Sequence, residues 1–194
     1  MATAEQIHDN YARRVDAIRG RRELSDHARR VALARAHRDT QNALTELHDQ
    51  ALADVAHERT RLERKIFGNT GTTDPAAAIS RRDAADRAAG LTDPRAAAQL
   101  LARAERSRDE HLAQAVAAHA AENGWGDILT SYTATRPAAA QALDELSSLP
   151  NPDDLQLNFM RLVAHQAPTP PELGTLSAWQ IAQLADTDEY GDLA

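Results

Sequence analysis

Histidines, carboxylates and glycines are the residues of this sequence that could support catalysis or hold a metal, and their spacing favours neither. The eight histidines form no His-Glu-x-x-His pair, and His111 and His119 are two helical turns apart, too far to share one metal ion easily. The segment 186–192 begins like a calcium loop but has Tyr190 at its fifth position. The glycines of 68–71 are not followed by Gly-Lys-Ser/Thr. We therefore predict a non-enzymatic protein with no cofactor and no metal.

Arginine pairs recur every eight residues in the first third of the chain. They are Arg13, Arg14, Arg21, Arg22, Arg29 and Arg30. On one helix they would form a basic ridge that could contact phosphates or an acidic surface. The C-terminal third is the opposite, because residues 137–194 hold one basic and nine acidic side chains. This polarity suits contacts between copies or with an acidic partner, and a solvated helix face with local ion pairs is the alternative.

The elements that carry these residues are expected to be helices that pack through small side chains. Hydrophobic residues make up 42% of the chain, but 41 of them are alanines and only 4% of the chain is aromatic. Each large apolar side chain contributes roughly 1.5–3 kcal/mol when buried, so the core is thin for 194 residues. This composition favours an elongated all-α protein that partner chains help to bury, and the absence of cysteine excludes disulfides.

The first 68 residues have helical periodicity. An apolar stripe with steps typical of a coiled-coil seam is formed by Leu44, Leu47, Val55, Leu62 and Ile66. Gly20 and Ser25 are suited to end one helix and cap the next, which predicts a helical hairpin of 3–20 and 26–66. A single unbroken helix is the alternative, since glycine costs only about 1 kcal/mol inside a helix.

A polar, glycine-containing segment at 69–75 is expected to be a hinge between the helical hairpin of 1–68 and a small helical bundle of 76–194 with an acidic tail. Asp-Pro pairs mark helix starts after it. The further helices are expected at 75–89, 94–106, 109–122, 126–134, 137–148, 153–165 and 176–186. Pro168 to Pro171 would form a stiff connector. Trp125, Ile128 and Tyr132 share one helical face, as core anchors or as part of a tetratricopeptide-like repeat.

The junction Arg61-Leu62-Glu63-Arg64-Lys65-Ile66-Phe67-Gly68 is followed by Thr73-Asp74-Pro75 and an Ala/Arg-rich helix to Arg87. This texture, over residues 60–135, resembles small Ala/Arg-rich helical structural and assembly proteins of actinobacterial phages and prophages. The resemblance implies a role in the head or neck of a virion, as a scaffolding, completion or connector component. It transfers no functional residue.

The function predicted from the sequence is structural or assembly work through helix-mediated protein contacts. The apolar stripe would meet a partner helix, and the arginines of 13–38 would meet an acidic surface, in a homo-oligomer or a larger shell or portal assembly. A nucleic-acid-associated protein that uses the arginine ridge is the alternative. No apolar run approaches the roughly 20 residues of a membrane span, so we expect the protein in the cytoplasm or in a virion.

Overall fold

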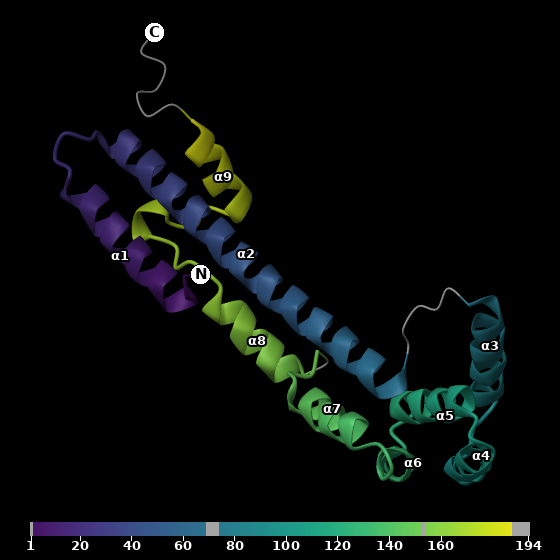
Figure 1. The fold of residues 1–194 in the computed structure, drawn as a ribbon. Coiled ribbons are helices and arrows are strands. Elements are labelled where there is room, and N and C mark those ends of the chain that lie inside the picture. Colours follow the sequence, from purple (N-terminus) through teal and green to yellow (C-terminus); the bar gives the residue numbers. More distant parts are fainter. Residues whose placement is uncertain (1, 69–73, 153, 188–194) are drawn as a thin grey trace. The chain divides into compact units, whose positions relative to one another are not determined.

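The computed structural model describes residues 2–68, 74–152 and 154–187. Within these ranges every regular secondary-structure element is a helix, which confirms the all-α prediction. The helices are α1 (Ala4–Gly20), α2 (Asp26–Phe67), α3 (Pro75–Ala89), α4 (Pro94–Ser107), α5 (Glu110–Glu122), α6 (Gly126–Thr133), α7 (Pro137–Ser148), α8 (Leu155–Ala164) and α9 (Ala178–Asp186), with a short 3₁₀ helix η1 (Pro171–Leu173) before α9 (Figure 1). Most of the hinge expected at 69–75 and the acidic tail from 188 lie outside the described residues.

Local capping explains most helix starts. Thr3 and Ser177 form capping boxes with Gln6 and Gln180, so each cap satisfies two backbone donors of its own helix start. Asp74 and Asp93 cap helices whose first residue is proline, where the missing N–H costs nothing. The capping side chains therefore fix where these helices begin, and tertiary packing then decides which helices contact one another.

The chain divides into two compact units, and their bounds differ from the division at 69–75 that the sequence suggests. Unit 1 combines Met1–Asp54 with Asn151–Ala194, and unit 2 is Val55–Pro150. The difference arises because the C-terminal segment packs on the N-terminal helices instead of joining α3 to α7. Helix α2 supplies its first part to unit 1 and its last three turns to unit 2.

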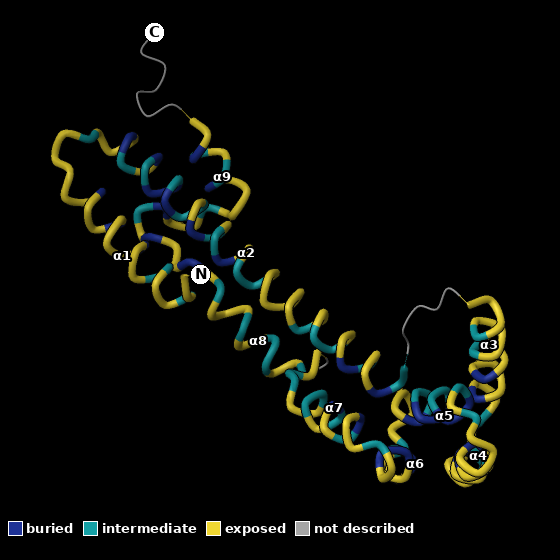
Figure 2. The backbone as a smooth tube through the Cα atoms, viewed as in Figure 1, coloured by how far each residue is buried: buried dark blue, intermediate teal, exposed yellow. Residues whose placement is uncertain are grey.

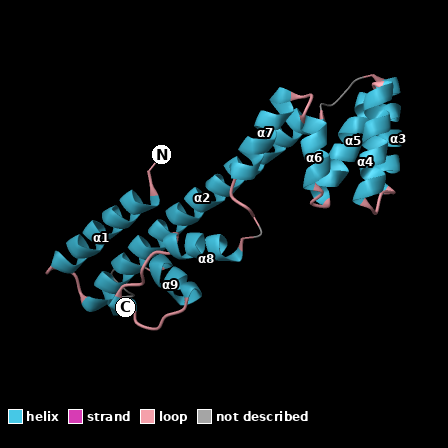
Figure 3. Cartoon of the chain, turned by 90° about the horizontal axis from the view of Figure 1, so that it is seen from below, coloured by secondary structure: helices cyan, strands magenta, loops and turns pink. Residues whose placement is uncertain are grey.

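Unit 1 has a core built from both ends of the chain. Its buried residues include Tyr11, Val15 and Ile18 of α1, Leu33 and Leu44 of α2, and Leu173 and Ile181 near the C-terminus. Figures 1 and 3 show α1 and the first part of α2 running in opposite directions, and side chains of both helices contact the segment that precedes α9. This segment, residues 165–177, is called the strap here.

Unit 2 is a bundle of short helices around α5. This helix packs against α3, α4 and α6, and α6 also contacts α7. The core of the unit consists largely of buried alanines, among them Ala97, Ala104, Ala117 and Ala142, which let the helix backbones approach closely. Larger anchors are Ile128 and Tyr132, both buried as core residues, and the Tyr132 hydroxyl donates to the Ile66 carbonyl at 2.9 Å. Close packing of small residues thus replaces bulky side chains in this unit.

Candidate interaction surface

The apolar stripe expected to meet a partner helix is largely used inside the chain itself. Leu44 is buried in the core of unit 1, and Leu62 and Ile66 are buried in the core of unit 2. Leu47 and Val55 are half-buried. The stripe therefore does not form one continuous free face, because two separate cores cover successive stretches of the same long helix.

The arginine pairs do not lie on one helix, so no single ridge forms. Arg13 and Arg14 belong to α1, Arg21 and Arg22 to the turn, and Arg29 and Arg30 to α2. Arg14 pairs with Asp39 at 3.1 Å, and Arg29 pairs with Asp26 at the same distance. Arg13 donates to Asn10, and Arg21 lies 3.7 Å from Glu23. Arg22 and Arg30 are exposed and make no hydrogen bond or ion pair among the described residues.

Several of the other arginines of 13–38 meet an acidic partner within their own chain. Arg19 of α1 binds Glu172 of the strap with two hydrogen bonds of 2.6 and 3.0 Å. That bonding, chiefly the hydrogen bond from Arg19, lowers the pKa of the Glu172 carboxyl. Arg38 binds Asp186 at 2.6 Å, and Arg35 donates to the carbonyls of Ala185 and Thr187, each at 2.9 Å. The opposite charges of the two chain ends are therefore matched within unit 1.

The first half of the strap is held by polar side chains of α1 and α2. The Tyr11 hydroxyl donates to the Pro168 carbonyl at 3.1 Å, and His37 Nε2 lies 3.2 Å from the Ala167 carbonyl oxygen. Gln41 receives the Ala167 N–H at 2.9 Å and donates to the His165 carbonyl at 3.2 Å. Burial raises the pKa of Tyr11 to about 12 and lowers that of His37. These contacts satisfy backbone groups that a proline-rich extended segment cannot pair by itself.

Helix α8 carries most of the exposed large apolar side chains of unit 1. It has no buried residue, and Figure 2 shows none along it. Its exposed large hydrophobic residues, called the α8 face here, are Leu155, Phe159, Met160, Leu162 and Val163. Leu155 is 84% exposed and Phe159 66%. Leu155, Phe159, Leu162 and Val163 follow the steps i, i+4, i+7 and i+8, so they line one side of the helix.

Polar contacts at the two ends of α8 position it. Asp154 caps the helix by accepting from the N–H groups of Gln156 and Leu157, both at 3.0 Å, and Asn158 donates to the Pro152 carbonyl at 2.6 Å. At the other end, His8 Nε2 lies 3.0 Å from the Ala164 carbonyl oxygen. The rings of His165 and His48 are 5.0 Å apart. The helix is thus attached through its ends, and its apolar side is left open.

The sequence predicts a helix at 153–165, but the residues of the α8 face are not among the predicted partner-binding residues. The signal was present in the pattern Leu-x-x-x-Phe-x-x-Leu-Val, which begins at Leu155 and gives an apolar side without any other segment assigned to cover it. The apolar stripe of α2 is the stronger periodic signal because it spans more turns. The length of an apolar pattern does not indicate whether other segments of the same chain bury that face.

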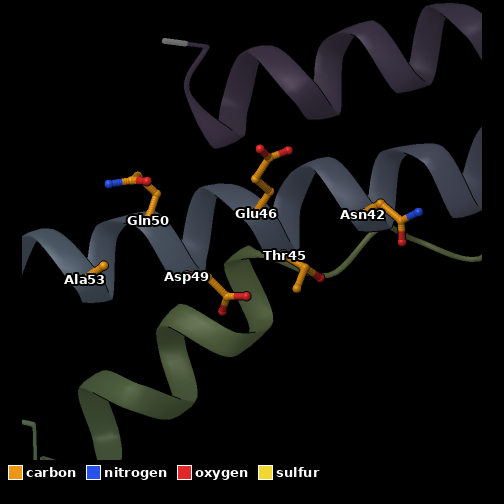
Figure 4. A pocket seen from close by; sticks show the side chains of 6 residues that line it. All are labelled: Asn42, Thr45, Glu46, Asp49, Gln50 and Ala53. Carbon is orange, nitrogen blue, oxygen red and sulfur yellow. The ribbon is translucent and has the colours of Figure 1, made fainter.

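A hollow on α2 offers no comparable site. Asn42, Thr45, Glu46, Asp49, Gln50 and Ala53 line it, and they all belong to one helix. Figure 4 shows the labelled side chains leaving α2 in different directions, so they do not converge on one point. The described residues also contain no group of three or more potential metal ligands. His119 has its Nε2 at 2.9 Å from the Leu91 carbonyl oxygen, a contact that joins α5 to the turn after α3 within unit 2.

Comparisons of the chain with protein families, with curated proteins and with solved structures give no match. No helix in the described parts is both long enough and apolar enough to cross a membrane.

Proposed function

We propose that this chain is a non-enzymatic structural or assembly protein that associates with further copies of itself through the α8 face. The observation that carries the proposal is a ten-residue amphipathic helix in which no side chain is buried. Isolated helices of this length are only marginally stable in water, and most helices in proteins gain stability by burying their apolar side. A partner surface would supply that burial for α8.

A second copy of the chain is the occupant that the size of the surface favours. The five side chains of the α8 face expose on the order of 500 Å², which is comparable to the largest apolar patch of a typical monomer. Two such faces packed about a two-fold axis would bury about 1,000 Å², the lower limit of a specific interface. The same patch on both copies makes the contact self-complementary, as cyclic dimers require.

The helical hairpin expected from the sequence has a supporting role in this proposal. Helices α1 and α2 would form that hairpin and hold the strap between polar contacts. His8 of α1 and Gln41 of α2 contact the carbonyls of Ala164 and His165, which fixes the C-terminal end of α8. The resemblance to actinobacterial phage and prophage proteins supports a role in a virion head or neck as part of this proposal. Contacts of modest size suit such assemblies, because many copies bind together and avidity adds to each weak contact.

The test is the mass of the full chain in solution, measured by light scattering after gel filtration over a range of concentrations. We expect the wild type to gain mass with concentration and the double variant Leu155→Ser/Phe159→Ser to remain monomeric. The matched control is Ile79→Ser/Trp179→Ser, which removes two large exposed side chains outside α8, 71% and 66% exposed, and should associate like the wild type.

Circular dichroism separates loss of association from loss of folding, since both double variants should keep the helicity of the wild type. A wild type that stays monomeric at every concentration would contradict the proposal. Equal loss of mass in both variants would also contradict it, because the association would then reflect general surface hydrophobicity.

A further inference from the structure

We propose that unit 2 binds a small phosphate-bearing molecule in a cleft between the end of α2, α3 and α5. The cleft has a volume of about 740 Å³, within the range of about 300–1,000 Å³ that is typical of small-molecule sites. Every residue that lines it belongs to unit 2. This inference is independent of self-association through α8.

The rim of the cleft is basic. Four arginines line it, Arg59 and Arg64 from α2 and Arg81 and Arg82 from α3, against the two acidic residues Glu63 and Glu122. Glu122 lies 3.9 Å from His119 Nδ1. The cleft therefore carries a net positive charge from side chains of two different helices.

Two of these arginines have no partner of their own. Arg64 and Arg82 are exposed and make no hydrogen bond or ion pair within the described part of the chain, whereas Arg59 donates to the Pro150 carbonyl at 3.3 Å. A guanidinium presents several N–H donors in a planar fork that fits the oxygens of phosphate. Two unpaired forks at the edge of one cleft are suited to a phosphate group or a diphosphate.

The interior of the cleft adds an apolar surface and one unsatisfied polar atom. Phe67, Ala115 and Ala118 supply apolar wall, which suits the non-ionic part of a ligand. His111 also lines the cleft, and its Nδ1 is buried without a hydrogen-bond partner among the described groups. Buried polar atoms are rarely left unpaired, so a ligand atom at His111 would remove a cost that the free protein carries.

The size and the mixed lining favour a small molecule over a polymer backbone. A nucleotide has the required combination of a charged phosphate group and a flat, weakly polar body, and it matches the volume of the cleft. A nucleic-acid duplex would instead need phosphate contacts spread along an open surface. The site therefore predicts binding of a free phosphorylated compound.

The experiment is calorimetric titration of the full chain with pyrophosphate, ATP, adenosine and a 20-base-pair duplex. We expect saturable binding of pyrophosphate and ATP, tighter binding of ATP because of the apolar wall, and no binding of adenosine alone. The variant Arg64→Gln/Arg82→Gln should weaken ATP binding at least about tenfold, since each arginine donates charge-assisted hydrogen bonds.

The matched control is Arg95→Gln/Arg103→Gln, which removes the same charge from exposed arginines of α4 outside the cleft. This control should bind ATP within about twofold of the wild type. NMR provides a second readout, because the imidazole signals of His111 should shift on ATP binding in the wild type.

Three results would overturn the inference. They are no saturable binding of pyrophosphate or ATP, equal weakening by both double variants, or duplex binding that is tighter than ATP binding. Light scattering on the same samples keeps the two proposals distinguishable, because both arginine variants should associate like the wild type whatever they bind.

Discussion

Unit 1 and unit 2 are both built from helices, but the residues of their cores come from different parts of the sequence. The core of unit 1 joins residues from both chain ends, such as Tyr11 and Ile181, whereas unit 2 is continuous in sequence. In unit 2, α5 packs against its neighbours in the chain, and alanines form much of the core. Contacts between distant residues close large loops and form slowly, while local contacts form fast. We therefore expect unit 2 to fold first.

The two units also differ in how they use arginine. In unit 1, Arg19 and Arg38 reach acidic residues near the other end of the chain. In unit 2, Arg136 binds Glu105 and Glu110, its neighbours in the same bundle, and stacks over the Tyr132 ring at 4.3 Å. Unit 2 also leaves Arg64 and Arg82 without partners. Ion pairs thus join the two chain ends in unit 1, whereas in unit 2 the unpaired Arg64 and Arg82 line a cleft.

The largest expected effect comes from the core of either unit. Leu33→Ala in unit 1 and Leu101→Ala in unit 2 both remove a buried leucine and should each cost about 2–5 kcal/mol of unfolding free energy. Hydrogen exchange should show α1 and α9 losing protection together in Leu33→Ala, while α5 keeps it. Leu101→Ala should show the reverse pattern. Uniform loss of protection in both variants would mean that the two units unfold as one.

The helices were largely predictable from the sequence because their signals are local. Apolar periodicity, Asp-Pro starts and Gly20 predicted bounds that the structure reproduces to within two residues. Each signal is read within one or two turns of its own helix, so it does not depend on tertiary contacts. Propensity and capping suffice for this level of structure.

The division into units and the candidate surface were not predictable in the same way. The sequence shows that 13–38 is basic and the C-terminal third acidic, but not that Arg19 meets Glu172 in the same chain. The prediction assigned the acidic partner to another copy of the chain or to another protein, with local ion pairs on a solvated helix face as the alternative. The α2 stripe was assigned to a partner helix for the same reason, since periodicity shows that a face is apolar and leaves open which segment covers it.

A smaller effect is expected from the hydroxyl of Tyr11, which fastens the strap to α1. Tyr11→Phe should destabilise unit 1 by about 0.5–1.5 kcal/mol through loss of the hydrogen bond to Pro168. The folded pKa of Tyr11 is raised from 10.0 to about 12, so folding favours the neutral phenol. This stabilisation is complete below pH 10 and is lost as the pH rises through about 12.

The check is the pH dependence of unfolding between pH 9 and 12, followed by the exchange of α1 amides. The wild type should lose stability in unit 1 over this range, and Tyr11→Phe should lose less. Tyr132→Phe is the matched control, because it removes a buried hydroxyl that donates to the Ile66 carbonyl in unit 2. An alkaline response of α1 that is the same in Tyr11→Phe and the wild type would show that the strap does not depend on this phenol.

The smallest effect concerns the ion pair between the two chain ends. The pKa of Glu172 lies below its ordinary value of 4.5, mainly because Arg19 donates to the carboxylate. The pair therefore stabilises unit 1 fully above that ordinary value, and the stabilisation is lost as the pH falls through the lowered pKa. Glu172→Gln should remove this acid dependence from α1 and the strap, with only a slight loss of stability at neutral pH because the pair is partly exposed to solvent. Glu110→Gln, which weakens the local pair with Arg136, should change the exchange of unit 2 alone. If Glu172→Gln left the acid unfolding of α1 unchanged, apolar packing of Leu173 and Ile181 alone would account for the closure of unit 1.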